Sequence, residues 1–252
     1  MGLTKLSIIV PVFNEEATLA LLLERVRLAA SALGPYEILA VGDMSQDASP
    51  RILREQQARH QDMVVIMKSV NRGKGKAIQE GLKWATGDII LIQDADLEYD
   101  PADYARLVEP IRSGQAQVVY GSRFLQPSYR MRPLSRAANW ALTRLTNVLY
   151  GATLTDMETC YKAFRADVVR SIPLQARRFD FEPEITAKIL RQGIVIHEVP
   201  IAYEARTKDE GKKIGWQDGV GAAWALLRHR FSRGGETAAE VEVSWPHGET
   251  RG

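Results

Sequence analysis

Two aspartates follow a short apolar run in this 252-residue chain, and they are the first residues whose spacing suggests chemistry. The segment from Gly87 to Asp96 reads Gly-Asp-Ile-Ile-Leu-Ile-Gln-Asp-Ala-Asp, and its apolar part predicts a buried strand. On an extended backbone Asp94 and Asp96 share a face. Carboxylates this close repel each other unless a cation joins them, and oxygen ligands suit Mg²⁺ or Mn²⁺. The alternative is an acidic turn after a strand, which so short a motif favours when taken alone.

The segments around this strand alternate between strand and helix patterns. Strands are expected at 6–13, 37–41, 63–68, 89–92 and 117–120. Helices are expected between them, with Ser49-Pro50 and Asp100-Pro101 as cap-plus-proline starts and Pro110 kinking or ending the fourth helix. Such alternation predicts an α/β protein with a mainly parallel sheet covered by helices on both faces.

The pattern becomes irregular after residue 124. Residues 124–136 are polar, basic and contain two prolines, so we expect a loop there. Helices are then expected at 135–150, 181–192 and 215–231, and strands at 162–165 and 195–203. The last helix carries a broad apolar face, which includes Trp216, Val220, Ala223, Trp224, Leu227 and Phe231. We expect this face to pack on the sheet, with contact to a lipid surface as the less favoured alternative.

Composition limits the classes of protein that need be considered. Hydrophobic residues make up 45% and charged residues 25%, which is typical of a globular domain. A net charge of +2 gives no reason to expect a nucleic-acid partner. The single cysteine, Cys160, fits a reducing compartment. No apolar run approaches the roughly 18 residues of a membrane span, so we expect a soluble, cytoplasmic protein. Peripheral attachment to a membrane surface is compatible with this expectation.

Four polar segments stand where the predicted parallel strands end. They are Pro11–Glu15, Gly42–Asp47, Asp94–Asp96 and Gly121–Phe124. Open α/β sheets bind ligands at this edge, so the four segments together suggest a nucleotide site with a metal between carboxylate and diphosphate. Each segment taken singly is also compatible with ordinary turn chemistry.

The complete set of motifs resembles glycosyltransferase family 2, and within it the dolichyl-phosphate mannosyltransferase-like and other polyprenyl-phosphate glycosyltransferases. The matching segments are Pro11–Glu15, Ser45–Asp47, Asn71–Ala77, Asp94–Pro101, Gly121–Phe124, Leu154–Lys162, Phe181–Glu184, Glu198–Pro200, and Arg206 with Glu210–Trp216. The resemblance implies the GT-A fold with a Rossmann-like N-terminal half. It also implies one domain over 1–231, with a nucleotide-sugar half at about 5–124 and an acceptor half at about 125–231. We expect residues 232–252 to be a disordered tail.

The resemblance further implies roles for single residues. On the donor side, Pro11, Phe13, Glu15 and Asp43 would line the base and ribose, Asp94 and Asp96 would bind the metal and diphosphate with Glu98 near the metal, and Arg206 and the Lys212-Lys213 loop would close over the donor. On the acceptor side, Arg123 would contact a phosphate that Arg132, Ser135 or Arg136 helps to hold. Asp96 and Arg123 would be the catalytic residues. Asp156 and Glu158 would either bind ligand directly or orient a loop against the arginines.

One segment departs from the family pattern. The family usually has two adjacent aspartates followed by glycine and serine, where this chain has Gly42, Asp43, Met44 and Ser45. The first carboxylate and the turn glycine are therefore missing, which leaves the preferred nucleotide base open.

The expected function is inverting, metal-dependent transfer of a hexose of mannose or glucose type. The donor would be GDP-mannose or a UDP-hexose, and the acceptor a dolichyl or undecaprenyl phosphate at a membrane surface, where a membrane partner protein is compatible. One alternative is a saccharide or other hydroxyl acceptor, for which Asp156, Glu158, Glu182 or Glu184 would serve as base. Another is a nucleotide-sugar-binding protein that has lost catalysis, as Gly42 and Met44 suggest.

Overall fold

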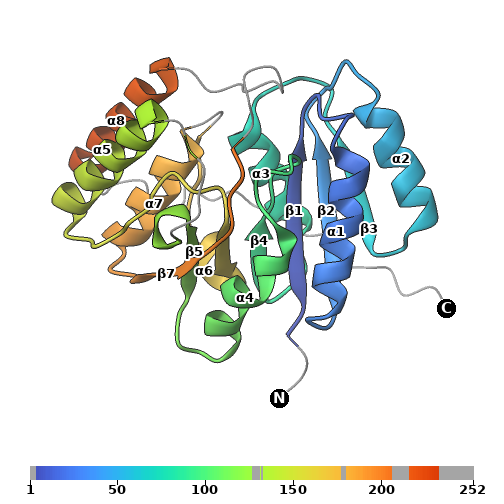
Figure 1. Ribbon diagram of the computed structural model, residues 1–252, viewed down its shortest axis with the longest axis horizontal. Coiled ribbons are helices and arrows are strands. Elements are labelled where there is room, and N and C mark those ends of the chain that lie inside the picture. The colour runs from blue at the N-terminus through green and yellow to red at the C-terminus, as the bar shows by residue number, and fades with distance from the viewer. Residues whose placement is uncertain (1–3, 127–130, 132, 177–179, 206–215, 233–252) are drawn as a thin grey trace.

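The computed structural model describes residues 4–126, 131, 133–176, 180–205 and 216–232. A seven-stranded sheet in the order β3-β2-β1-β4-β6-β5-β7 forms its centre (Figure 1). The strands are β1 (Leu6–Val12), β2 (Tyr36–Gly42), β3 (Met63–Met67), β4 (Ile89–Ile92), β5 (Val118–Ser122), β6 (Lys162–Arg165) and β7 (Ile196–Pro200). Among these seven strands, only β6 runs antiparallel to its two neighbours, β4 and β5, while the other strand pairs are parallel. The prediction of a mainly parallel, mixed sheet is confirmed.

Helices cover both faces of this sheet (Figure 1). They are α1 (Leu19–Ser31), α2 (Ser49–Arg59), α3 (Lys74–Trp84), α4 (Tyr104–Arg112), α5 (Pro133–Tyr150), α6 (Ala166–Arg170), α7 (Phe181–Arg191) and α8 (Trp216–Phe231), with short 3-10 turns at Pro101–Asp103 and Arg123–Leu125. Alternate residues of one strand enter opposite hydrophobic clusters: Ile8 packs with α1 and α4, whereas Ile9 packs with α3 and α7. Because side chains alternate along a strand, apolar strands such as β1 are buried on both faces.

Two details at helix ends differ from the expectation. Helix α2 begins at Ser49 itself, so the N-cap position falls on Ala48, which has no side chain able to cap the helix, and the Ser49 N–H donates to Asp47 Oδ1 at 3.0 Å instead. Pro110 lies inside α4, which continues to Arg112. The Asp100 cap is confirmed, since its Oδ1 accepts the Ala102 N–H at 3.0 Å.

The expectation for the last helix is wrong. α8 packs against α5 and α7 through small or inward-facing residues such as Ala222 and Leu226, which are buried. The large apolar side chains Val220, Trp224 and Phe231 are exposed instead of packing on the sheet. Alanines on the inner side let α8 lie close to its neighbours, and the wider apolar face is left outside.

Two further expectations concern membrane spans and the C-terminal tail. Among the described residues, no helix combines the length and apolar character needed to cross a bilayer. The tail expected at 232–252 lies outside the described residues except for Ser232, which donates its N–H to the Arg228 carbonyl at 2.9 Å.

Candidate active site

The segments that follow β1 and β2 are held together by side-chain hydrogen bonds. The Asn14 N–H donates to Ser45 Oγ at 3.0 Å, and Asn14 Oδ1 accepts the Gln46 N–H at 2.8 Å. The Glu15 N–H donates to Ser49 Oγ at 3.0 Å. These bonds fix the backbone of residues 14 and 15 at the carboxyl edge of the sheet, where the sequence predicts a base and ribose site; the side chains of Phe13 and Glu15 are partly buried there.

Asp43 is buried and engaged by the loop that precedes α3. Its carboxylate lies 2.5 Å from Lys68 Nζ and accepts the N–H groups of Arg72 and Gly73 at 3.1 and 2.7 Å. Gly73 has φ 85°, a left-handed conformation that glycine adopts at little cost, and α3 begins one residue later. The carboxylate of Asp43 therefore sets the position of the α3 N-terminus.

The two residues beside Asp43 explain the departure from the family pattern. Met44 has φ 61°, the conformation for which the family's glycine is suited. A Cβ added to Gly42 would lie 2.9 Å from Met67 Sδ, so the Met67 side chain occupies the space that a carboxylate at position 42 would need. Met44 thus stands where the family has glycine, and Gly42 stands where it has the first aspartate, with the Met67 side chain beside it.

Asp94 and Asp96 lie just beyond the end of β4, and a buried glutamine holds the start of their loop. Gln93 Oε1 accepts the hydroxyls of Tyr104 and Tyr161 at 2.8 and 2.7 Å, while its Nε2 donates to the Asp94 carbonyl at 2.9 Å. Since these bonds come from α4 and from the segment before β6, the position of Asp94 depends on both halves of the chain. Gln93 is not among the site residues predicted from the sequence, where its signal is a polar residue that ends an apolar strand.

Lys74, at the start of α3, is the cation that the structure places at Asp94. Its Nζ lies 2.8 Å from Asp94 Oδ1, 2.8 Å from Glu182 Oε1 and 3.1 Å from Cys160 Sγ. Burial opposes the charge, but the carboxylates of Asp94 and Glu182 outweigh it and raise the pKa of Lys74 well above its ordinary value. Desolvation also raises the pKa of the partly buried Cys160 thiol, which disfavours the thiolate form that a nucleophile needs.

Asp96 and Glu98 complete the acidic loop. Asp96 Oδ1 accepts the Glu98 N–H at 3.1 Å, and Glu98 Oε2 accepts the Tyr203 hydroxyl at 3.0 Å. Within the described ranges no three His, Cys, Asp or Glu side chains are grouped closely enough to hold a metal on their own. Mg²⁺ usually takes only one or two carboxylates and completes its shell with water and substrate phosphates. The hard oxygens of Asp94 and Asp96, partly exposed at the sheet edge, therefore fit a divalent cation that arrives with a diphosphate.

Arg123 is held by a buried carboxylate. Its Nε and Nη2 donate to the two oxygens of Asp156 at 2.7 Å each, and its backbone N–H donates to Oδ2 at 3.0 Å. The Arg123 guanidinium also lies 5.1 Å from the centre of the Tyr203 ring. Burial opposes the charge, but Asp156 outweighs it and raises the pKa of Arg123. These contacts favour the interpretation in which Asp156 orients the arginine.

Of the other acidic residues proposed as bases, Glu182 and Glu184 are already engaged. Glu182 pairs with Lys74, and Glu184 accepts the N–H groups of Gln175 and Ala176 and pairs with Lys188. Glu158 differs, because its Oε1 is shut off from solvent without a hydrogen-bond partner among the described residues. Burial, and then the charge of Glu182, raise the pKa of Glu158 to about 8.

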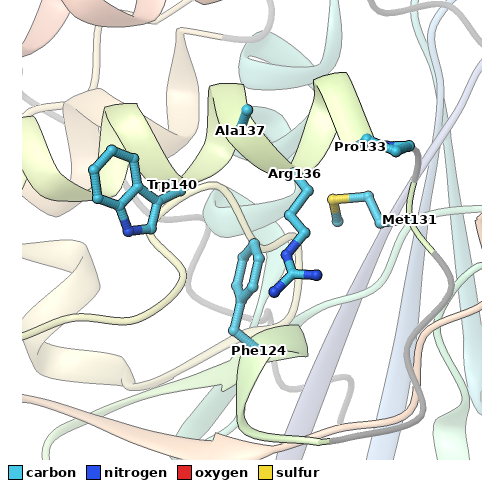
Figure 2. A pocket seen from close by; sticks show the side chains of 6 residues that line it. All are labelled: Phe124, Met131, Pro133, Arg136, Ala137 and Trp140. Carbon is cyan, nitrogen blue, oxygen red and sulfur yellow. The ribbon is translucent and has the colours of Figure 1, made fainter.

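A pocket of about 390 Å³ lies beside the start of α5. Apolar side chains form most of its wall, and Figure 2 shows the Arg136 guanidinium beside the Phe124 ring. The lining residues are Phe124, Met131, Pro133, Arg136, Ala137 and Trp140. Arg136 thus stands in a mainly apolar pocket, and Ser135 is partly buried on the same helix. Arg132, Arg206, Lys212 and Lys213 lie outside the described residues.

The family model described as Glycosyl transferase family 2 matches residues 7–172. The chain belongs to glycosyltransferase family 2. It is 32% identical over 208 residues to undecaprenyl-phosphate 4-deoxy-4-formamido-L-arabinose transferase from Edwardsiella ictaluri, a match that covers 82% of this chain and 62% of the relative. It is 31% identical over 243 residues to undecaprenyl-phosphate mannosyltransferase from Micrococcus luteus, covering 88% of this chain and 97% of the relative. The chain therefore spans about six tenths of the first relative and nearly all of the second.

Solved structures confirm the fold. Glucosyl-3-phosphoglycerate synthase from Mycobacterium tuberculosis, in complex with Mn²⁺, UDP and phosphoglyceric acid, superimposes with a TM-score of 0.71 at 20% identity. The same enzyme with Mg²⁺ and UDP gives a TM-score of 0.68 at 20% identity, and both matches cover 90% of this chain and 79% of the synthase. The predicted GT-A fold of family 2 is thus confirmed.

Replacing Met44 by glycine should raise the free energy of unfolding by about 0.5–1 kcal/mol. A left-handed conformation costs an L-residue about 1–2 kcal/mol, and the greater freedom of glycine in the unfolded chain removes about 0.5–1 kcal/mol of the gain. Urea unfolding of the wild type and Met44→Gly measures the change. Met44→Ala is the control, because it shortens the side chain and keeps the Cβ; a glycine variant no more stable than this alanine variant contradicts the account.

Replacing Asp156 by asparagine should lower the free energy of unfolding by about 3 kcal/mol, because it leaves the buried Arg123 guanidinium without its counter-charge. Asp167→Asn is the matched control, since it breaks an exposed pair in which Arg165 Nε lies 2.6 Å from Asp167. Urea unfolding should detect almost no change for the control. Equal losses of unfolding free energy in the two variants would contradict a larger contribution from the buried Arg123–Asp156 pair.

The buried Glu158 should make stability depend on pH. Its pKa is raised from 4.5 to about 8, so between these values the folded protein binds a proton that the unfolded chain releases. The wild type should therefore lose stability as pH rises from 5 to 8, and Glu158→Gln should lack this contribution. Urea unfolding at several pH values measures the difference between the two proteins. A difference that stays constant across this range would contradict the raised pKa.

Proposed function

We propose that this protein is an inverting, metal-dependent glycosyltransferase that moves a hexose from a nucleotide sugar to a polyprenyl phosphate. The observation that carries the acceptor class is the pocket beside α5, which presents one guanidinium, that of Arg136, in a mainly apolar wall. A lipid phosphate has this same division into a charged head and a hydrocarbon chain. The Micrococcus luteus relative, similar over 97% of its own length, supports the same class of acceptor by its name.

The donor would bind at the carboxyl edge of the sheet. Pro11, Phe13, Glu15 and Asp43 would line the base and ribose, with Arg206 and Lys212 closing over the donor. Asp94 and Asp96, with Glu98 nearby, would hold Mg²⁺ or Mn²⁺, which supplies positive charge to the leaving diphosphate. Lys74 is already charged beside Asp94 and would add a second positive group for the same oxygens.

The acceptor would need orientation more than deprotonation. A phosphate monoester has its second pKa near 6, so it is mostly dianionic at neutral pH. One of its oxygens would attack the anomeric carbon from the face opposite the diphosphate, the bond from that carbon to the diphosphate oxygen would break, and the configuration would invert. Arg123, oriented by Asp156, and Arg136 would hold the phosphate, with Arg132 and Ser135 contributing from the same region.

The acceptor also implies where the protein acts. A polyprenyl chain remains in the bilayer, so the enzyme would work as a peripheral protein on the cytoplasmic face of the membrane. GDP-mannose and UDP-hexoses are the donors to test, and a membrane partner protein is compatible with this location.

Glu158 supports a second candidate function. A hydroxyl acceptor needs a general base, and a carboxyl group with a pKa of about 8 is within the range suited to one near neutral pH. In that case Glu158→Gln would abolish transfer. With a phosphate acceptor the same variant should retain activity.

The acceptor is tested by incubating the protein with Mn²⁺, membrane lipid extract and labelled GDP-mannose, UDP-glucose or UDP-N-acetylglucosamine. One donor should label a lipid-phosphate fraction. Label that reaches only protein, saccharide or free sugar contradicts the lipid acceptor. Donor binding with no turnover for any acceptor would favour a binding protein.

Asp96→Asn should reduce this transfer by about 10²-fold or more. The metal would lose a carboxylate ligand, and the charge on the leaving diphosphate would be stabilised less. Asp88→Asn is a matched control, since Asp88 is an exposed carboxylate at the opposite end of β4. Initial rates of lipid labelling measure both variants. Equal rates for the two would contradict the assignment of Asp96.

A further inference from the structure

Three large apolar side chains of helix α8 lie on its outside. Val220, Trp224 and Phe231 are 61%, 66% and 73% exposed. Their spacing of four and seven residues places them on one side of the helix. Ala222, Ala225 and Leu226 on the other side are buried and fill the contact with the rest of the protein. The three exposed side chains are therefore not needed to hold α8 on the rest of the protein.

Helix α5 continues this exposed surface. Its Leu134, Trp140 and Val148 are 83%, 65% and 73% exposed. The two helices touch, and the Tyr150 hydroxyl at the end of α5 donates to the Leu226 carbonyl of α8 at 2.6 Å. Figure 1 shows α5 and α8 side by side at the end of the molecule farthest from β3. We call these six exposed side chains of α5 and α8 the outer face.

On α5 and α8, the exposed charged side chains that the structure describes are all basic. Arginines at 136, 144, 228 and 230 are exposed on the two helices. α5 contains no acidic residue, and α8 contains only Asp218 in its first turn. Apolar side chains with tryptophans, bordered by basic residues, are the combination by which helices bind in the headgroup region of anionic bilayers. A second copy of this chain fits less well, because an isologous contact would bring the same arginines together.

We propose that the outer face of α5 and α8 docks on an anionic phospholipid bilayer. Trp224, Phe231 and Leu134 enter the boundary between headgroups and acyl chains, and Arg228 and Arg230 contact lipid phosphates. Trp140 belongs to the outer face and also lines the Arg136 pocket, so docking brings that pocket to the level of the headgroups. This last step rests on the proposed function, because it lets a lipid phosphate reach Arg136 while its chain remains in the bilayer.

Binding to vesicles tests the docking separately from transfer. The full chain should sediment with vesicles of phosphatidylglycerol and phosphatidylcholine, and more weakly with phosphatidylcholine alone. Trp224→Ser should weaken partitioning by about tenfold or more, the loss expected for one large apolar side chain. Arg228→Ser and Arg230→Ser should each weaken binding to the anionic vesicles by roughly fivefold.

Leu28→Ser and Trp84→Ser are the matched controls, because these side chains are 76% and 53% exposed on α1 and α3, away from the outer face. They should bind vesicles as the wild type does. Equal binding to neutral and anionic vesicles, or equal losses in the controls and Trp224→Ser, would overturn the proposal. So would a wild-type dimer in solution that Trp224→Ser converts to a monomer, which would assign the face to a second copy.

Transfer assays separate the two proposals. Trp224→Ser should transfer sugar to a short-chain prenyl phosphate in detergent at the wild-type rate, and should be slower only with acceptor in vesicles. If the wild type transfers to no lipid phosphate but still binds anionic vesicles through Trp224, the docking stands and the proposed acceptor is wrong. If Trp224→Ser loses detergent-phase transfer to the same degree as vesicle binding, the role of the face in docking is contradicted.

Discussion

The contact of Lys74 with Asp94 and Glu182 is the interaction on which the site depends. Several carboxylates come together at one sheet edge, and such a cluster is stable only where positive charge offsets it. Lys74 starts α3 in the N-terminal half, while Glu182 lies in α7 of the C-terminal half. The ion pair therefore neutralises the aspartate loop and also joins the two halves of the chain. Lys74 would therefore hold this loop in position before the donor and its divalent cation bind.

The proposed acceptor side follows the same principle with the signs reversed. Arg123 is buried, and the two oxygens of Asp156 accept hydrogen bonds along one edge of its guanidinium, so the arginine is fixed before any ligand binds. Asp156 is in turn held by Glu198, whose carboxylate accepts the N–H groups of Thr155 and Asp156 at 2.7 and 2.9 Å. Preorganised charge of this kind is what transfer between two phosphate groups requires, because the groups need no rearrangement as charge develops.

The sheet could be predicted from the sequence because the patterns that indicate strands and helices depend on residues close together in the chain. Apolar strands alternating with amphipathic helices identify a mainly parallel α/β fold without any knowledge of contacts. The aspartate loop after β4 could be located for the same reason. What the sequence could not supply were contacts between distant segments: the pairing of Lys74 with Glu182, the support of Asp94 by Gln93 and two tyrosines, and the space that Met67 fills beside Gly42. The apolar face of α8 was wrongly expected to pack on the sheet. Apolar periodicity shows that a helix has an apolar face, but it does not show what covers that face.

The proposed site requires that Asp94 and Asp96 hold a divalent cation together with the donor diphosphate. Calorimetric titration of GDP and UDP into the wild type and Asp94→Asn, with and without Mn²⁺, tests it most directly. Mn²⁺ should strengthen the binding of one nucleotide to the wild type by about tenfold or more, and Asp94→Asn should remove this dependence on the metal. Nucleotide binding that is equally tight with and without Mn²⁺, or an Asp94→Asn variant with unchanged dependence on the metal, would contradict it.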